Sequence, residues 1–157
     1  MNTGEIFLSP MNEEDLEFVN STRNFKSTRK WLENNELISL EATKCWYENN
    51  KPKWLIISFN SKKVGYIRTS DDTKKSLCIG CDINPNYRRQ GYAKQTYEIL
   101  LKSLYAKGYV NIWLDVFEKN IPAISLYRKL GFKPINSRIV RGEKYITMVH
   151  ENYNEEI

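Results

Sequence analysis

The stretch that decides the fold runs from Ser76 to Lys94 and reads SLCIGCDINPNYRRQGYAK. Its first eight residues, Ser76–Ile83, are mostly small or apolar and are followed by an Asn-Pro pair, which is the pattern of a buried strand and a turn. From Gly91 onward, apolar side chains recur at helical spacing. The sequence therefore predicts a strand, a basic turn that contains one glycine, and a helix, in that order.

The turn between this strand and this helix has chemistry that suits an anion. The first amides of a helix have no acceptor within the helix, and the helix dipole makes that end positive. Gly91 allows a ligand to approach the backbone closely, and Arg88, Arg89 and Lys94 add positive charge. These features predict a site for a phosphate or pyrophosphate; the alternative is an ordinary solvated turn before an amphipathic helix.

Two segments carry a family resemblance. The hexapeptide Arg88–Ala93, RRQGYA, is similar to the signature Arg/Gln-x-x-Gly-x-Gly/Ala, and the downstream segment Asn120–Phe132, NIPAISLYRKLGF, is similar to a second signature at the expected spacing. Both belong to the GNAT superfamily of acyl-CoA-dependent N-acetyltransferases, which this chain resembles. The resemblance implies an α/β (α+β) fold of one domain, with a mixed, mostly antiparallel central sheet and helices on both faces. In that fold the fourth and fifth strands, here Ser76–Ile83 and Asn111–Phe117, splay apart around the acyl-CoA arm.

Composition and charge agree with a globular protein that binds an anion. The chain has 157 residues, of which 41% are apolar and 27% are charged, and this predicts one domain over residues 1–150 with a frayed polar tail over residues 151–157. Residues 88–133 hold nine Lys and Arg against three acids. Such a concentration of positive charge suits either nucleic acid or a phosphate-rich cofactor such as coenzyme A.

Three cysteines and the absence of long apolar runs indicate where the protein works. An odd number of cysteines argues against a disulfide framework and fits the reducing cytoplasm. No apolar run approaches the roughly 20 residues that a membrane span needs, and the first ten residues do not resemble a signal peptide. We expect a cytoplasmic protein without a membrane partner.

The remaining chain predicts short strands and helices. Asn12 and Ser39 are placed to cap helices, while Pro122 and Gly131 are placed to begin and end one. The predicted strands are Glu5–Ser9, Trp54–Phe59, Val64–Thr69, Ser76–Ile83, Asn111–Phe117, Phe132–Ile135 and Glu143–Val149, with polar turns at Asn60–Lys63 and Ser70–Lys75.

The resemblance also implies roles for residues at matching positions. Backbone amides of the turn would hold the pyrophosphate of acetyl-CoA, and main-chain groups of the preceding strand would hold the pantetheine arm or the acetyl carbonyl. Tyr127 matches the tyrosine that protonates the departing sulfur, and a tyrosine is ordinarily protonated at pH 7; a core tyrosine is the alternative. The cofactor-binding residues implied in this way are Cys81, Ile83, Arg88, Arg89, Gln90, Gly91, Tyr92, Ala93, Lys94 and Asn120.

The general base stays open. Several protein-lysine acetyltransferases carry a Glu early in the central strand, where this chain has Leu77. Asp82 and Glu118 are candidates because each lies at a predicted strand end, although each could equally be a solvated carboxylate. A chain of water molecules to a more distant carboxylate is a further possibility.

The acceptor side is predicted in the first half of the chain. The segment from Thr22 to Tyr47 is similar to GNAT members that acetylate amino sugars on nucleotide carriers, of the pseudaminic-acid pathway type, and more loosely to the ribosomal-protein N-terminal acetyltransferases. It departs from the former at Thr22 and Thr43, where they carry Trp and His. The residues that could contact an acceptor, or simply lie on the surface, are Arg23, Asn24, Arg29, Trp31 and Trp46.

Other chemistries find little support. Cys78 and Cys81 form a C-x-x-C pair on a predicted strand rather than at a helix start, and no second pair could complete a zinc site. His150 is the only histidine, which disfavours histidine-based hydrolysis and histidine-rich metal sites. The ten tyrosines and four tryptophans could stack on nucleic acid, but a core or a pocket accounts for them more simply.

The sequence as a whole predicts an acetyl-CoA-dependent N-acetyltransferase. The expected acceptor is the primary amine of a small molecule, best a nucleotide-linked amino sugar, and the alternative is a protein N-terminus. A non-catalytic CoA- or nucleic-acid-binding module is the remaining reading. We expect acetyl-CoA as the co-substrate, no metal, no nucleic-acid partner, and a monomer or homodimer.

Overall fold

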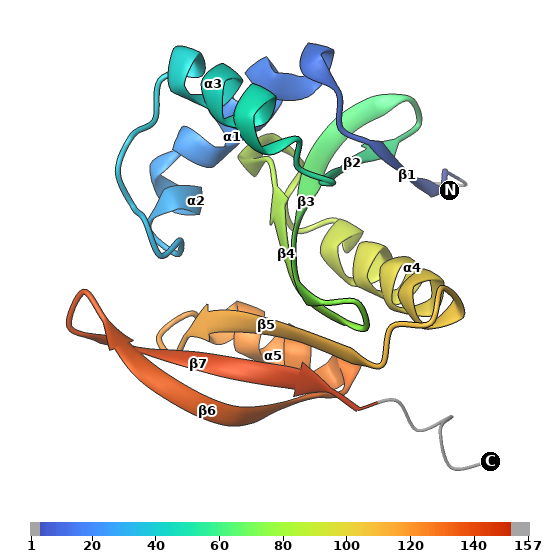
Figure 1. The fold of residues 1–157 in the computed structure, drawn as a ribbon, viewed down its shortest axis with the longest axis vertical. Helices are drawn as coiled ribbons and strands as arrows, with labels where there is room; N and C mark the ends of the chain where they lie inside the picture. The colour runs from blue at the N-terminus through green and yellow to red at the C-terminus, as the bar shows by residue number, and fades with distance from the viewer. Residues whose placement is uncertain (1–3, 152–157) are drawn as a thin grey trace. The chain divides into compact units, whose positions relative to one another are not determined.

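The computed structural model describes residues 4–151 (Figure 1). The elements in chain order are β1 (Ile6–Pro10), the 3₁₀ helix η1 (Glu13–Asp15), α1 (Leu16–Asn24), α2 (Lys26–Arg29), α3 (Leu40–Asn50), β2 (Leu55–Phe59), β3 (Lys62–Thr73), β4 (Ser76–Ile83), the 3₁₀ helix η2 (Pro85–Tyr87), α4 (Tyr92–Ala106), β5 (Asn111–Phe117), α5 (Ile121–Leu130), β6 (Phe132–Val140) and β7 (Glu143–His150). This mixture of strands and helices confirms the predicted fold class.

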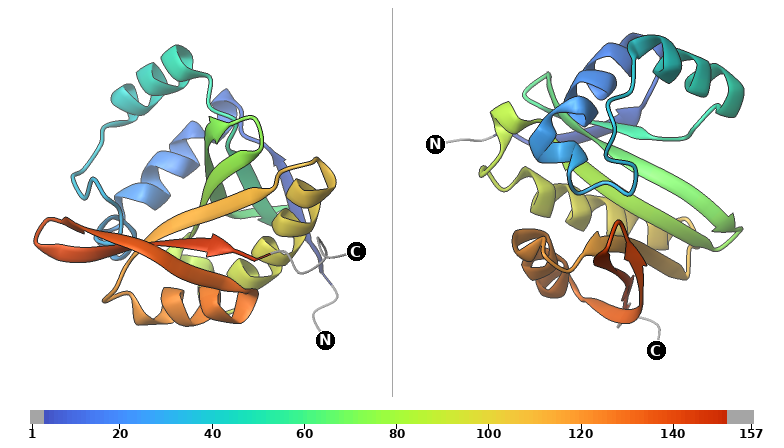
Figure 2. Two further views of the ribbon diagram at one scale, coloured as in Figure 1. Left: turned by 60° about the horizontal axis from the view of Figure 1, so that its bottom comes forward. Right: turned by 90° about the vertical axis from the view of Figure 1, so that its left-hand side faces the viewer.

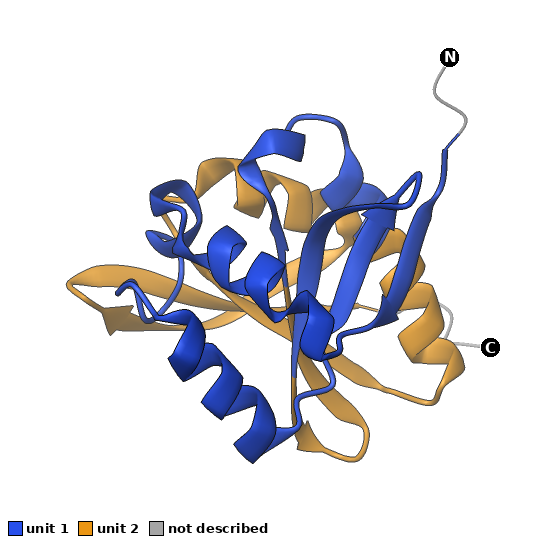
Figure 3. Cartoon of the chain, turned by 90° about the horizontal axis from the view of Figure 1, so that it is seen from above, with its two compact units in different colours: residues 1–69, 81–96 blue, residues 70–80, 97–157 orange. Residues whose placement is uncertain are grey.

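The chain forms two compact units, coloured separately in Figure 3. The first comprises residues 1–69 and 81–96, and the second comprises residues 70–80 and 97–157. Strands β3 and β4 each contribute to both units. The expectation of one domain over residues 1–150 remains a prediction, and residues 152–157 of the predicted tail lie outside the described residues.

The strands follow the order β1-β2-β3-β4-β5-β7-β6 in a sheet of seven. The pairs β1–β2, β2–β3, β5–β7 and β7–β6 are antiparallel, and β4–β5 is parallel. Over the residues that the structure describes, the parallel register joins Ser76–Cys78 to Asn111–Trp113. Figure 2 shows β6 and β7 as a long hairpin.

Local signals at the helix ends act as predicted. The Asn12 side chain accepts from the Glu14 amide, and the Asp15 carboxylate accepts from the Asn12 amide at 2.9 Å, so the two residues form a capping box. The Ser39 hydroxyl accepts from the Ala42 amide at the start of α3. Gly131 ends α5 with a φ of 102°, a conformation that glycine adopts without steric cost.

The first unit has its core between α1 and the strands. Leu16 and Val19 of α1 are buried together with Met11, Ile56 and Tyr66. The Trp54 and Tyr66 rings stack with centroids 5.6 Å apart. Each fully buried leucine or isoleucine stabilises such a core by about 1.5–3 kcal/mol. Partly buried Phe18, Trp46, Tyr47 and Trp54 pack against this cluster.

In the second unit, one face of α4 is buried, and aromatic side chains surround the buried Phe132. Leu100, Leu101 and Leu104 of α4 are each 6% exposed or less, as helical spacing predicted. Phe132 lies edge-on to the ring of Tyr127, with centroids 5.9 Å apart, and its centroid lies 5.0 Å from that of His150.

Three predicted boundaries were wrong by two or more residues, each in an exposed part of the chain. Strand β3 continues to Thr73 instead of ending at Thr69, and β6 continues to Val140 instead of Ile135. The predicted four-residue connection at Asn60–Lys63 is a two-residue turn, because Lys62 and Lys63 pair with β2. Asn60 and Ser61 both have positive φ, as a tight hairpin turn of the I′ type requires.

His150 joins the end of α5 to α4 and makes stability depend on pH. Its Nε2 bonds the Leu130 carbonyl at 2.8 Å and its Nδ1 accepts from the Tyr105 hydroxyl at 2.7 Å. Burial lowers the pKa of His150 below 6.5, although the Leu130 hydrogen bond and the Glu151 charge oppose this shift. The unfolded chain therefore binds the proton first as pH falls, and the free energy of unfolding decreases from about pH 7 downward.

We expect the urea midpoint of unfolding to be lower at pH 5.5 than at pH 7.5. Because His150 is the only histidine, a His150→Asn variant should lose most of this dependence while being less stable at both values. Equal midpoints for the wild type at the two pH values would contradict the assignment.

Candidate active site

The turn between β4 and α4 is shaped for a ligand that accepts hydrogen bonds. Helix α4 begins at Tyr92, and the Gln95 amide donates to the Gly91 carbonyl at 3.2 Å. The amides before Gln95 lie at the helix start, where no intrahelical acceptor exists and the dipole is positive. Gly91 has a φ of 79°, and a Cβ added there would meet only Gln95 Nε2, at 3.8 Å. The backbone of the turn is therefore open to approach.

Arg89 adds a second unusual conformation to this turn. Its φ of 64° lies in the left-handed region, which costs a non-glycine residue on the order of 1 kcal/mol. The Arg89 side chain is exposed. Beside it, the Tyr92 hydroxyl donates to Gln90 Oε1 at 3.0 Å, and the Tyr92 ring packs against Phe59. The side chains of Gln90 and Tyr92 thus support the turn, and their amides remain the predicted ligand contacts.

Arg88, which was predicted to contact the cofactor, is hydrogen-bonded within the protein. Its Nε donates to the Ile83 carbonyl at 3.2 Å, and its two terminal nitrogens donate to the hydroxyls of Ser27 and Thr28 at 2.7 Å each. Burial lowers the pKa of Arg88, and the Asp82 charge partly offsets this. The guanidinium is therefore directed toward α2.

The end of β4 carries Cys81, Asp82 and Ile83. A Cβ on Gly65 of β3 would lie 2.4 Å from the Asp82 carbonyl oxygen, so only glycine permits the two strands to approach this closely. Burial raises the pKa of the Cys81 thiol, so this cysteine is no thiolate nucleophile at neutral pH. The Asp82 carboxylate pairs with Arg68 Nε at 3.0 Å.

Tyr66 lies beside this ion pair. It is fully buried, its hydroxyl has no hydrogen-bond partner among the described residues, and burial followed by the Asp82 charge raises its pKa well above 10. The nearby arginines Arg68 and Arg23 act in the opposite direction. Asp82 thus faces both a guanidinium and a neutral phenol.

The predicted acceptor residues Arg23, Asn24 and Arg29 hold a loop. Arg23 donates to the carbonyls of residues 34 and 36, and Arg29 donates to the carbonyls of Asn24 and residue 35. The Asn24 carboxamide both donates to the Ile38 carbonyl and accepts from the Ile38 amide, so it satisfies both backbone groups of Ile38. These contacts fix the segment from residue 30 to residue 38 against α1 and α2.

The two predicted acceptor tryptophans have different surroundings. Trp31 is half-buried on this loop, and Lys30 Nζ lies 5.0 Å from its ring centroid. Trp46 packs on Trp54 with centroids 4.7 Å apart, within the core of the first unit. Trp46 therefore has a core role in addition to any contact with an acceptor.

In the second unit, Tyr127 lies on α5 and Asn120 directly precedes this helix. The Tyr97 and Tyr127 hydroxyls are hydrogen-bonded at 3.3 Å, and the two rings meet edge to face. Asn120 precedes α5 at the capping position, yet its side chain makes no capping hydrogen bond. Since asparagine commonly caps helices through its side chain, this carboxamide is available for another partner.

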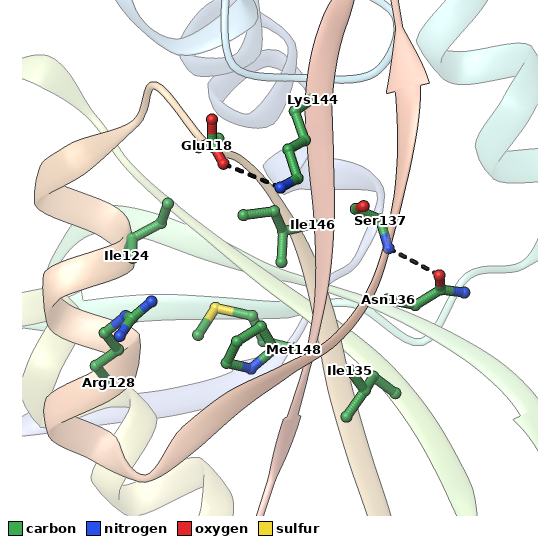
Figure 4. A pocket seen from close by; sticks show the side chains of 10 residues that line it. Glu118, Ile124, Arg128, Ile135, Asn136, Ser137, Lys144, Ile146 and Met148 are labelled. Carbon is green, nitrogen blue, oxygen red and sulfur yellow. Dashed lines mark hydrogen bonds and ion pairs between the residues drawn. The ribbon is translucent and has the colours of Figure 1, made fainter.

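Glu118 lies at the edge of a pocket of about 400 Å³ in the second unit (Figure 4). Its carboxylate pairs with Lys144 at 3.4 Å, and its side chain is 54% exposed. The pocket lies between α5 and the β6–β7 hairpin, and is lined by Glu118, Ile124, Arg128, Pro134, Ile135, Asn136, Ser137, Lys144, Ile146 and Met148. Glu118 is thus a solvated carboxylate with one ion-pair partner.

The family follows from comparison with known proteins. A family model described as the acetyltransferase (GNAT) family matches residues 17–132. The chain belongs to the GNAT acetyltransferase family. This confirms the resemblance seen in Arg88–Ala93 and Asn120–Phe132, both of which lie wholly within the match.

Curated GNAT relatives include enzymes named for a ribosomal protein. The [ribosomal protein bS18]-alanine N-acetyltransferase of Escherichia coli K12 is 31% identical over 88 residues, which are 56% of this chain and 57% of that protein. Its counterpart in Salmonella typhimurium LT2 is 35% identical over 108 residues, which are 68% and 71% of the two chains. The matched part of this chain thus spans little more than half of the E. coli relative.

Solved structures of two N-acetyltransferases share the fold. A spermidine N-acetyltransferase from Vibrio cholerae, in complex with CoA and spermine, has a TM-score of 0.84 at 17% identity over 92% of this chain and 94% of that chain. A ribosomal-protein-alanine N-acetyltransferase from Brucella melitensis has a TM-score of 0.77 at 17% identity over 93% and 99%. At these identities the likeness shows the fold alone.

Two absences are found in the part of the chain that the structure describes. No group of three or more His, Cys, Asp or Glu side chains is arranged to hold a metal ion. No helix there is both long and apolar enough to cross a membrane.

Some residues of the candidate site had no signal in the sequence. Ser27, Thr28 and Arg68 contact predicted site residues, but each lies 14 or more positions from its partner. No local pattern reports such a pairing.

Proposed function

We propose that this chain is an acetyl-CoA-dependent N-acetyltransferase acting on a primary amine. The observation that carries the proposal is the turn at Gly91, where the start of α4 is open to a ligand within a sequence match to the GNAT family. A 15-residue helix with an accessible N-terminus suits a pyrophosphate. The spermidine N-acetyltransferase from Vibrio cholerae, which shares this fold, was solved in complex with CoA.

The residues that would hold acetyl-CoA fit it chemically. The amides of Gln90, Gly91, Tyr92, Ala93 and Lys94 would donate to the pyrophosphate, with Arg89 adding charge. Main-chain groups of the β4 end and the Asn120 carboxamide would bind the pantetheine arm. Bound there, acetyl-CoA supplies a thioester whose carbonyl carbon an amine can attack.

Transfer then requires one C–N bond to form and one C–S bond to break. The leaving sulfur takes a proton, for which the Tyr127 hydroxyl is the proposed donor. The amine nitrogen loses a proton, for which Asp82 and Glu118 are the candidate acceptors, directly or through water. Asp82 is the more enclosed of the two, with a side chain 10% exposed against 54% for Glu118.

For the acceptor we propose the α-amine of a protein or peptide N-terminus. The curated relatives at 31% and 35% identity are named as alanine N-acetyltransferases of a ribosomal protein. The rival acceptor, a nucleotide-linked amino sugar, was expected to meet Arg23 and Arg29. Both guanidinium groups donate to loop carbonyls instead, which weakens that expectation.

A panel of amines tests the acceptor. We expect release of the CoA thiol with a hexapeptide that begins with a free alanine, and an acetyl group on its α-amine by mass spectrometry. The same peptide with a formylated N-terminus is the matched control and should be inert. Faster turnover of a UDP-linked amino sugar or of spermidine would transfer the assignment to small molecules, and no turnover with any amine despite acetyl-CoA binding would favour a non-catalytic module.

A further inference from the structure

Arg88 joins three parts of the first unit. Its Nε donates to the last carbonyl of β4, at Ile83, and its terminal nitrogens donate to Ser27 and Thr28 of α2. The two hydroxyl contacts are both 2.7 Å, at the short end of the range for N–H···O hydrogen bonds. Three of the five N–H groups of the guanidinium are therefore engaged within the protein.

These contacts leave Arg88 poorly placed to bind a phosphate. Two-point recognition of a phosphate by arginine uses a pair of parallel N–H groups of the planar fork. Both terminal nitrogens of Arg88 already hold hydroxyls, and Thr28 is only 4% exposed. One N–H group on each terminal nitrogen is left for a phosphate, while the two hydroxyl contacts, which join residues some 60 positions apart, hold the guanidinium toward α2.

A second contact ties the same turn to α1. The Asn84 carboxamide donates to the Thr22 hydroxyl at 2.8 Å, with both residues buried. Asn84 also accepts from the Asn86 amide and so caps η2. The segment that leads from β4 into the turn at Gly91 is thus fixed to α1 by Asn84 and to α2 by Arg88.

Helix α2 is in turn hydrogen-bonded to the loop at residues 30–38, which belongs to the predicted acceptor side. Arg29, the last residue of α2, donates to the carbonyl of residue 35, and Arg23 and Asn24 of α1 hold the rest of the segment up to Ile38. A continuous series of hydrogen bonds therefore runs from the turn between β4 and α4 through Arg88 and α2 to residues 30–38.

We infer that Arg88 is a positioning residue for the acceptor side and no ligand of the acetyl-CoA phosphates. It fixes α2, and through α2 the loop at residues 30–38, to the turn at which the pyrophosphate of acetyl-CoA would bind. The role of that loop in binding the acceptor rests on the proposed function. The inference also distinguishes Arg88 from Arg89 and Lys94, because the sequence had predicted that all three contact the phosphates.

Two kinds of variant test the positioning role of Arg88, one that changes the hydrogen-bond donor and one that changes the acceptors. Arg88→Lys keeps the charge but cannot reach three acceptors, and the pair Ser27→Ala/Thr28→Val removes the acceptors while leaving Arg88 intact. We expect amide hydrogen exchange in residues 26–38 to be at least about fivefold faster in both. In both, acetyl-CoA affinity by calorimetry should stay within about twofold of the wild type.

Kinetics with the best amine of the panel supplies the decisive comparison. The KM for the amine should rise about fivefold or more, while the KM for acetyl-CoA and kcat change by less than about twofold. Combining all three substitutions should add little to either set alone, because they interrupt one connection.

A loss of acetyl-CoA affinity of tenfold or more in Arg88→Lys would overturn the inference, and so would unchanged exchange in residues 26–38. Arg89→Gln serves as the matched control, since it removes an exposed neighbouring charge and should leave the exchange of residues 26–38 unaltered. If wild-type protein binds no acetyl-CoA, the proposed function fails, while the exchange experiment still tests the connection itself.

Discussion

Replacing Tyr127 by Phe is expected to lower kcat by about 10²- to 10⁴-fold, the range in which a general acid contributes to a reaction. Acetyl-CoA affinity should change by less than about twofold, because the hydroxyl is proposed to act on the departing sulfur and no phosphate contact is lost. The substitution keeps the ring against Phe132 and Tyr97, so the fold should survive. Steady-state turnover and calorimetry on the same preparation measure the two effects.

Tyr105→Phe is the matched control for this experiment. Tyr105 is also on a helix of the second unit and its hydroxyl is also hydrogen-bonded, in this case to His150. It should lose some stability and keep its turnover. If Tyr127→Phe retained full turnover, Tyr127 would be a core tyrosine and the sulfur would take its proton from elsewhere.

Replacing Gly91 by Val should weaken acetyl-CoA binding by about 10- to 100-fold, the equivalent of one or two lost hydrogen bonds to a charged group. Space within the protein is not the reason, because an added Cβ meets only the end of the flexible Gln95 side chain. The reasons are the positive φ, which a β-branched residue resists, and the side chain that would stand where the pyrophosphate approaches. Calorimetric titration with acetyl-CoA measures the change.

Gly142→Val separates the two reasons. Gly142 has a φ of 75°, close to the 79° of Gly91, and an added Cβ there meets nothing within 4 Å. Both variants should lose a similar amount of stability, but only Gly91→Val should lose acetyl-CoA. A further variant, Ala93→Glu, places a negative charge where it suits the helix dipole but repels a phosphate. If Gly91→Val and Ala93→Glu both bound acetyl-CoA as well as the Gly142→Val control, the turn would be excluded as the cofactor site.

The parts of the fold that could be predicted are those whose signal is local. Asn12, Ser39 and Gly131 fix helix ends through contacts within a few residues, and β4 and β5 are short apolar runs that end where predicted. Strand β6 was predicted too short because most of its side chains are exposed, so they show no alternation of apolar and polar residues. Its length is set instead by pairing with β7.

The part of the candidate site that could be predicted is the part formed by backbone groups. The turn at Gly91 is recognisable because its glycine, its basic neighbours and its helix lie within one short stretch. The direction of each arginine side chain was not predictable. Arg23 and Arg29 were expected to meet an acceptor, and their contacts with the carbonyls of residues 34–36 depend on a loop conformation that no local pattern specifies.

The first unit is assembled from two separate pieces of chain, residues 1–69 and 81–96. A nascent polypeptide must therefore leave the ribosome past residue 96 before this half can be completed. Dividing the chain in the exposed hairpin turn at Lys74–Lys75 would give an N-terminal fragment that lacks β4 and the turn at Gly91. We expect such a fragment to regain its fold only when the complementary fragment is co-expressed, which makes this turn a natural place for a split-protein reporter.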